Sequence, residues 1–299
     1  MSISASMVKE LRERTGAGMM ECKRALVETG GGIDEAVELL RKSGQAKADK
    51  KSGRIAADGL VVVAADGKNA AITEINSETD FVAKDDNFIE FAQAVAAAAL
   101  AGDVSDVAGL NAEALGDGRT VEAARTELVA KVGENISLRR FARLQAVDHL
   151  GSYTHGARIA AIVSLQGGNA EIAREIAMHI AATNPVCIDE QGVPAETLER
   201  ERRIFSEQAA ESGKPPEIVE KMVTGRVAKF LREVTLLGQP FVKDPDVTVA
   251  KLLKDADASV TGFVRYEVGE GIEKKEENFA EEVMKQISES KSDSESKSE

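Results

Sequence analysis

The side chains in this sequence best suited to acid–base or metal chemistry are three histidines, His149, His155 and His179, and two cysteines, Cys22 and Cys187. A histidine can act as a general base or bind a metal ion, but metal sites also need His, Cys or carboxylate ligands at short, regular spacing. The three histidines lack such neighbours, and no Ser-His-Asp set, nucleophile elbow or carboxylate pair is recognisable. We therefore expect a protein that is not an enzyme and has no metal or cofactor, with structural or surface roles for its histidines.

The motif closest to a nucleotide-binding loop is Gly16-Ala17-Gly18. A dinucleotide loop follows a strand and carries a third glycine, whereas this segment follows a helical pattern and has none at the required spacing. The sequence also lacks the G-x-x-x-x-G-K-[ST] phosphate loop, so we expect no nucleotide site in the chain itself. The two cysteines lie far apart in sequence, which is typical of reduced thiols rather than of a disulfide framework.

The stretch most suggestive of function is Glu74–Lys84, EINSETDFVAK, which places Thr79-Asp80-Phe81-Val82 between a strand pattern and a helix pattern. In a structural interpretation, Thr79 or Asp80 caps the helix and Phe81 and Val82 pack on its first turn. In a functional interpretation, the apolar pair is presented to a partner. The residues alone leave both open.

Composition restricts the classes of protein that can be considered. The 299 residues carry 38 Lys and Arg against 51 Asp and Glu, a net charge of -13, which argues against broad nucleic-acid binding because phosphate contacts need a basic face. The length suits about two domains. The N-terminus lacks the apolar run of a leader, and no apolar stretch reaches the roughly 18 residues of a membrane span. We therefore expect a cytoplasmic protein without a membrane or direct nucleic-acid partner.

The elements that must position these residues begin with three short helices, predicted at 7–14, 19–29 and 33–42 and separated by glycines. Val8, Leu11, Cys22, Ala25, Leu26, Val37 and Leu40 can form their small core. Met19 and Met20 either complete that core or remain exposed for a partner. The basic segment 47–54 follows as a linker.

The middle of the chain predicts strands and alanine-rich helices. Strands at 55–64 and 70–75 flank an Asp-Gly turn, and a helix follows with Phe88 and Phe91 on its apolar stripe. A strand at 136–147 is expected to pair with 157–165 across 149–156, before a helix at 170–181. Because hairpin and helix recur, the sequence suggests a weak internal duplication of a two-layer unit.

Two helical segments at 194–211 and 216–234, joined by Ser212-Gly213-Lys214-Pro215, predict an antiparallel helical hairpin. Its apolar stripe either packs on the rest of the chain or mediates self-association. Short strands and one short helix follow over 236–268. An amphipathic helix is expected at 277–287, and the Ser/Lys/Glu-rich tail 288–299 is expected to be disordered.

The runs LRERTGAGMMECKRAL, INSETDFVAK, LGSYTHGARIA, GQPFV and GFVRYEVGEGIEK occur in this order from Leu11 to Lys274. Together they make the chain resemble the bacterial elongation factor Ts family. The resemblance implies an α+β fold with an N-terminal three-helix domain like ubiquitin-associated domains, a duplicated two-layer α/β core, an inserted antiparallel helical hairpin and a C-terminal helix. The expected divisions are a GTPase-binding domain with its linker at 1–54, the two halves of the core at 55–135 and 136–190, and a dimerisation module at 191–235. The chain is then expected to return to the core at 236–270, before the last helix at 271–287 and the tail at 288–299.

The resemblance also implies a function, guanine nucleotide exchange on elongation factor Tu in translation elongation. In this family the motif found here as Thr79, Asp80, Phe81 and Val82 is associated with dislodging magnesium from Tu. Met19, Met20 and Lys23 are expected to contact Tu from the three-helix domain, and His155 from the second half of the core. A homodimer through 191–235 is also implied. A protein-binding adaptor without effect on nucleotide is the rival interpretation, and an enzyme on the α+β core is a more distant one.

Overall fold

A computed structural model describes residues 3–211 and 214–273 of the chain. Over these residues the protein combines helices with small antiparallel sheets, as the expected α+β class requires. The expected helix at 277–287, the tail 288–299 and part of the hairpin turn at 212–215 lie outside the described residues. None of the described helices is both long and apolar enough to cross a membrane.

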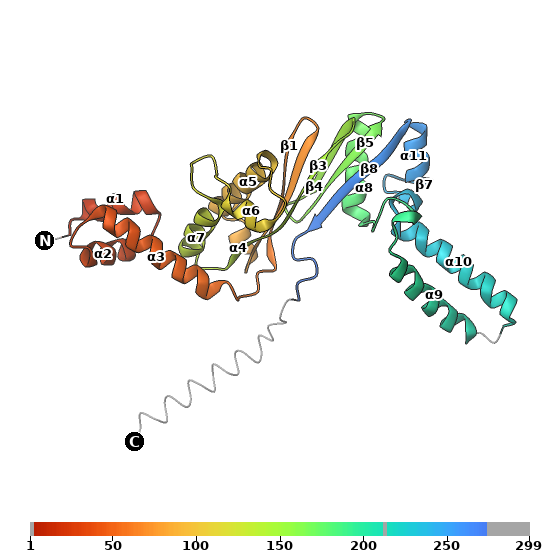
Figure 1. Cartoon of the computed structure of the whole chain (residues 1–299), viewed down its shortest axis with the longest axis horizontal. Coiled ribbons are helices and arrows are strands. Elements are labelled where there is room, and N and C mark those ends of the chain that lie inside the picture. The colour runs from red at the N-terminus through yellow and green to blue at the C-terminus, as the bar shows by residue number, and fades with distance from the viewer. Residues whose placement is uncertain (1–2, 212–213, 274–299) are drawn as a thin grey trace, which may run out of the picture.

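The N-terminal unit consists of three helices, α1 Ala5–Thr15, α2 Met19–Glu28 and α3 Ile33–Lys51, at one end of the molecule (Figure 1). Its predicted core is confirmed, since Val8, Leu11, Cys22, Ala25 and Leu26 are buried together and Val37 and Leu40 pack against them. The prediction that the third helix ends at residue 42 is wrong, because α3 continues to Lys51 and so includes the first part of the expected linker 47–54. Gly44 lies inside the helix, where its small size lets α3 pack closely on α7, and a methyl group at this position would lie 3.6 Å from Ala130.

The first sheet has the strand order β1-β2-β3, with β1 Asp58–Asp66, β2 Asn69–Ser77 and β3 Ile136–Gln145. The predicted Asp-Gly hairpin is confirmed by the antiparallel pairing of β1 with β2. Helices cover the outer face of this sheet, namely α5 Asp86–Ala101, α6 Val107–Ala112 and α7 Val121–Val132. Phe88 and Phe91 are buried in this layer, as their helical spacing predicts.

The second sheet has the order β4-β5-β8, with β4 His149–His155, β5 Ile159–Gly167 and β8 Ala258–Glu267. The predicted pairing of 136–147 with 157–165 is therefore wrong. The intervening segment is itself the strand β4, which pairs with β5 through a tight turn, whereas β3 pairs with β2 in the first sheet. The outer face is covered by α8 Ala170–Thr183 and α11 Val249–Asp255.

The inner faces of the two sheets pack against each other, through Val61, Ala70 and Ile72 of the first sheet and Ala160 and Ile162 of the second. The centre of the molecule is therefore a helix–sheet–sheet–helix sandwich (Figure 1). Both sheets are built in the same order, a hairpin followed by a covering helix and, later, a third strand that pairs with the hairpin's second strand.

A helical hairpin projects from the far side of the second sheet (Figure 1). Its two helices pack against each other, α9 Ala195–Ala210 and α10 Pro216–Val234. Short elements connect it to the core, namely η1 Glu190–Gly192, η2 Leu236–Gly238, β6 Pro240–Phe241 and β7 Asp244–Thr248. Hydrogen bonds between Val186 and Val234 and between Cys187 and Leu236 hold the two ends of the insertion side by side.

Candidate partner-binding site

The segment Thr79–Val82 forms the tip that follows strand β2. The single-turn helix α4, Asp80–Ala83, begins after Thr79, whose Oγ1 accepts a hydrogen bond from the amide of Val82 at 3.4 Å. The predicted cap at Thr79 is thus confirmed. The structural interpretation is wrong for Phe81, which is 80 % exposed, and holds for Val82, which packs on the core beside the buried Ala83. Of the apolar pair, only Phe81 is therefore presented outward. In one helical turn, residues that point inward at 82 and 83 leave residue 81 facing outward.

Glu134, in the loop after α7, holds the base of this tip. Its carboxylate accepts hydrogen bonds from Thr79 Oγ1 at 2.7 Å and from the Thr79 amide at 3.0 Å. Next to it, Glu78 accepts from the amide of Asn135 at 2.6 Å and pairs with Arg54 at 3.4 Å. Sequence reasoning missed Glu134 because it lies 55 residues from Thr79 and no local pattern marks it. The exposed ring of Phe81 is therefore carried by an anchored turn.

Asp80, the neighbour of Phe81, is exposed and paired with Lys84, its carboxylate lying 2.6 Å from Nζ across one helical turn. The hydrogen bond and charge of Lys84 lower the pKa of Asp80. Asp80 is thus a carboxylate at neutral pH, with its charge partly balanced by Lys84.

The predicted residues of the three-helix unit share the outer surface of α2. Met19 is 60 % exposed and Met20 64 % exposed, so they do not complete the small core, and Lys23 is also exposed. Val27, one turn beyond Lys23, is 62 % exposed and extends this surface. The helical spacing of 19, 23 and 27 is the signal that could have identified Val27.

His155 lies at the end of β4, exposed, with Nδ1 3.4 Å from the hydroxyl of Tyr153. It borders a groove between the second sheet and α8, lined by both apolar and charged side chains, including Tyr153, Ile159, Met178, Val242, Arg265 and Glu267. Val242 is 44 % exposed there. Among these, the sequence pointed only to His155, because most of the others come from β5, α8, β8 and the turn after β6, which are far apart in sequence.

The structure brings some predicted residues to one end of the sandwich. The turn after His155 carries Arg158, which pairs with Asp58 at 3.2 Å, and Asp58 is the register partner of Ser77 just before the tip. The tip and the His155 turn therefore lie at the same end of the paired sheets. The α2 surface belongs to the separate N-terminal unit (Figure 1).

Of the other histidines, His179 lies in structural surroundings. His179 is fully buried, its Nε2 is 2.9 Å from Gln239 Oε1, and its Nδ1 accepts from the amide of Val242. Burial lowers the pKa of His179, although the bond to Gln239 acts in the opposite direction. Over residues 3–211 and 214–273, His, Cys, Asp and Glu side chains form no group of three or more that could hold a metal ion.

Comparison with known proteins identifies the family. The family model "Elongation factor TS" matches residues 78–270. The chain is 64 % identical to an elongation factor Ts of Thioalkalivibrio sulfidiphilus and 62 % identical to one of Methylococcus capsulatus, each over 96 % of this chain and 99 % of the relative. An elongation factor Ts of Legionella pneumophila is 56 % identical over the same shares. The chain belongs to the elongation factor Ts family.

Proposed function

We propose that this protein is a guanine nucleotide exchange factor that accelerates the release of GDP from elongation factor Tu during translation elongation. The observation that carries the proposal is the tip, where an aromatic ring that is 80 % exposed stands on a turn anchored by Glu134. Exposing a phenylalanine costs hydrophobic free energy that burial in the chain's own core would recover. An anchored, exposed ring is therefore suited to insertion into another protein.

The proposed action is on the magnesium ion beside the bound nucleotide of the partner. Magnesium requires near-ideal octahedral geometry and is held partly by phosphate oxygens. A ring wedged among the groups that orient those ligands would disturb this geometry and weaken nucleotide binding. A thousandfold faster release needs a barrier lower by only about 4 kcal/mol, which a few contacts can supply.

Asp80 has a more limited role in this mechanism. Its charge disfavours nearby phosphate, but the ion pair with Lys84 reduces the field that it exerts. We propose that Asp80 mainly stabilises the turn beneath Phe81, and that the ring supplies most of the displacement.

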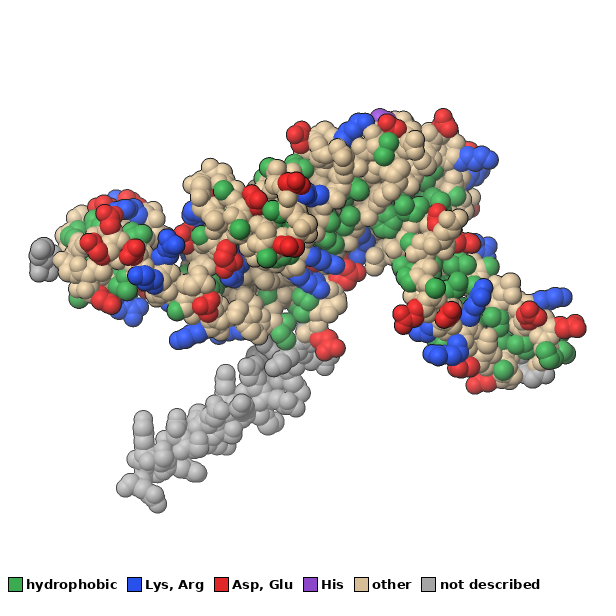
Figure 2. All heavy atoms as spheres, in the orientation of Figure 1, with side chains coloured by type: hydrophobic (Ala, Val, Ile, Leu, Met, Phe, Trp, Pro, Cys, Tyr) green, Lys and Arg blue, Asp and Glu red, His purple; other side chains and the backbone are tan. Residues whose placement is uncertain are grey.

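Two further surfaces are proposed to bind the same partner. The exposed face of α2, with Met19, Met20 and Lys23, offers flexible apolar contact. The groove beside His155 offers a second contact, at the same end of the sandwich as the tip. In this proposal the protein is a binding protein rather than an enzyme, and it works in the cytoplasm. Acidic and basic side chains are interspersed over the face drawn in Figure 2, which suits a protein partner better than nucleic acid.

Nucleotide and exchange factor must weaken each other's binding by the same factor, because coupling between two ligands of one protein is reciprocal. Incoming nucleotide therefore expels the factor and completes the exchange.

Stopped-flow release of fluorescent GDP from purified elongation factor Tu tests the proposal. The wild-type protein should accelerate release, and Phe81→Ala should lose most of the acceleration while keeping most of the affinity. Val147→Ala is a matched control, since Val147 is also exposed, at 48 %, but lies away from the tip. Full acceleration by Phe81→Ala would refute the wedge, and binding without acceleration by the wild-type protein would favour an adaptor.

The helical hairpin is proposed to mediate self-association. Val227 is buried between its helices, but Val219, Val223 and Leu231 are only half-buried and line an open groove beside α9. A second copy could cover this stripe.

A further inference from the structure

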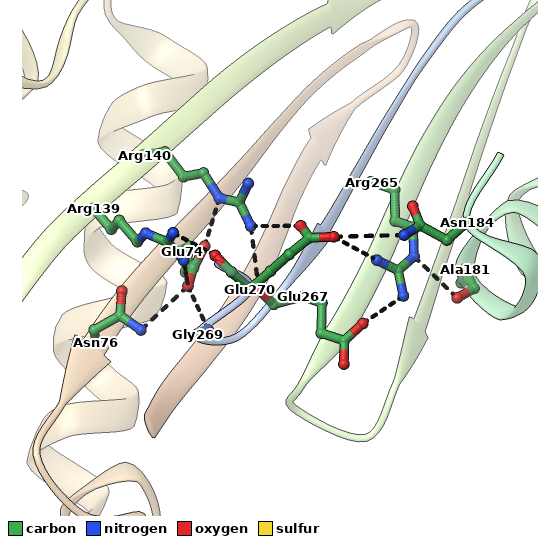
Figure 3. A network of polar contacts seen from close by, with 10 residues as sticks. All are labelled: Glu74, Asn76, Arg139, Arg140, Ala181, Asn184, Arg265, Glu267, Gly269 and Glu270. Carbon is green, nitrogen blue, oxygen red and sulfur yellow. Dashed lines mark hydrogen bonds and ion pairs between the residues drawn. The ribbon is translucent and has the colours of Figure 1, made fainter. Parts of the chain in front are cut away.

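The most deeply buried charge at the centre of the sandwich is the carboxylate of Glu74, on β2, which has no exposed surface (Figure 3). It accepts hydrogen bonds from Arg139 at 2.9 Å, from Arg140 at 2.5 Å, from the amide of Gly269 at 2.8 Å and from Asn76 at 3.2 Å. Burial disfavours the ionised form, but the bonds from Gly269 and the two arginines outweigh it and lower the pKa of Glu74. One carboxylate thus joins β2, β3 and the turn after β8.

A β-bulge makes this arrangement possible. Glu74 pairs with Arg140 and Ile75 pairs with Leu138, so Arg139 is the extra residue in β3. Successive residues of a regular strand point to opposite faces, whereas a bulge can turn two neighbours to one side. Both guanidinium groups therefore reach the same carboxylate.

The contacts continue from Glu74 to the groove beside His155. Arg140 pairs with Glu270 at 3.1 Å, and Glu270 lies 3.6 Å from Arg265, which pairs with Glu267 at 2.7 Å. Arg265 also donates to the carbonyl of Ala181 at the end of α8, at 3.2 Å. Since Arg265 and Glu267 line the groove, and β2 leads from Glu74 directly into the tip, the network connects the two proposed contact surfaces.

This network is not the arrangement that stability alone would favour. Buried ion networks gain little over well-packed apolar residues, and Asn76 Oδ1 is left without a hydrogen-bond partner here. The corresponding bulge of the second sheet is formed without buried charges. There Ser164 takes the place of Glu74, and its hydroxyl lies 2.5 Å from that of Thr261, the extra residue of β8.

We infer that Glu74 is a positioning residue, which fixes the tip and the His155 groove relative to each other so that both engage one partner at the same time. The functional part of this inference rests on the proposed function. When two surfaces are held at the separation that the partner requires, binding of the first makes binding of the second an intramolecular event. The resulting gain in affinity falls when the separation of the two surfaces fluctuates.

The experiment measures the separation and the function independently. Spin labels on the exposed positions Asp86→Cys, after the tip, and Thr154→Cys, next to His155 on β4, report the distance distribution in a Cys187→Ser background. Glu74→Gln should at least double the width of that distribution and reduce the acceleration of GDP release by about tenfold. Glu270→Ala, at a partly exposed link, should cause a smaller change in the same direction without endangering folding.

Ser164→Ala is the matched control, since it removes a buried polar contact at the equivalent bulge of the second sheet. It should lower the melting temperature but leave both the distribution and the GDP-release rate within twofold of wild type. An unchanged width in both Glu74→Gln and Glu270→Ala would overturn the positioning role. A broader distribution with full exchange activity would overturn its link to function. Failure of the wild-type protein to accelerate release would instead refute the proposed function, while the label distances would still decide the positioning.

Discussion

At the scale of single residues, the tip depends on Thr79, which uses its side chain and its amide at once. Its hydroxyl donates to Glu134 and accepts from the amide of Val82, and its own amide donates to the same carboxylate. The direction of Phe81 is set two residues away by these bonds. A residue that holds the base of the tip can therefore control the contact proposed for Phe81.

Replacement of Thr79 by alanine should weaken the tip through two losses, the helix cap and the anchor to Glu134. The cap alone is worth about 1 kcal/mol. We expect Thr79→Ala to lower the free energy of unfolding by at least that amount, and to slow GDP release from the partner several-fold although Phe81 is intact. Chemical denaturation and stopped-flow fluorescence measure the two effects.

Thr120→Ala provides the comparison, because Thr120 caps α7 in the same way, accepting from the amide of Ala123 at 3.1 Å. Thr120→Ala should lower the free energy of unfolding by about 1 kcal/mol, the usual worth of a cap, and leave the exchange rate unchanged. Equal losses of exchange in both variants would mean that general destabilisation, rather than the tip, is responsible.

At the scale of elements, the docking of α3 on α7 depends on the size of residue 44. A methyl group at Gly44 would lie 3.6 Å from Ala130 and 4.0 Å from Thr126, which is ordinary contact. Because glycine inside a helix is less favourable than alanine, Gly44→Ala should raise the free energy of unfolding by about 0.5–1 kcal/mol. Gly44→Leu should overfill the contact and move the N-terminal unit away from α7.

Thermal denaturation and small-angle scattering distinguish these outcomes. Gly44→Ala should melt later at an unchanged radius of gyration, whereas Gly44→Leu should give a larger radius. If Gly44→Leu leaves the radius unchanged, close packing of α3 on α7 does not set the position of the N-terminal unit.

The contact between α8 and the β6 region should make stability depend on pH through His179. Its lowered pKa means that the folded protein binds fewer protons than the unfolded chain just below the ordinary histidine pKa of about 6.5. The contribution of neutral His179 to the free energy of unfolding is therefore fully present above that pH, and it is lost as the pH falls toward the folded-state pKa.

Melting temperatures between pH 8 and pH 5 test this expectation. The wild-type protein should lose stability on acidification, and His179→Gln should show a shallower slope from a lower starting value. The slope is the diagnostic quantity, because the variant also loses packing. Parallel slopes would show that other groups cause the acid sensitivity.

Sequence patterns predicted those parts of the fold that depend on local residues. The Asp-Gly turn, the cap at Thr79 and the core stripe of Phe88 and Phe91 were all recognisable, because turn chemistry and helical periodicity involve near neighbours. The pairing of β3 and the anchoring role of Glu134 were not, since each joins residues far apart in sequence. Gly44 was misleading because a glycine near a helix end and a glycine at a helix–helix contact look identical in sequence.

At the scale of the whole molecule, the sandwich separates the end proposed to contact the partner, here called the contact end, from the projecting hairpin. The tip and the His155 turn lie at one end of the paired sheets, the three-helix unit extends beyond α7, and the hairpin leaves from the far side of the second sheet (Figure 1). This arrangement leaves the groove between α9 and α10 open while a partner occupies the contact end. Self-association and exchange should therefore be separable.

The separation can be tested by shortening the hairpin without disturbing its base. A cut at Thr235 would damage the core, because Thr235 is buried and bonds to Leu231. Replacing 204–230 by a short glycine-rich linker instead keeps the paired ends of the insertion.

In sedimentation equilibrium the full chain should associate with increasing concentration, and the shortened chain should stay monomeric. Both should accelerate GDP release equally, since the groove beside His155, the tip and α2 are intact in the shortened chain. Association of the shortened chain would assign the dimer contact elsewhere, and a loss of exchange would show that the hairpin belongs to the contact with the GTPase.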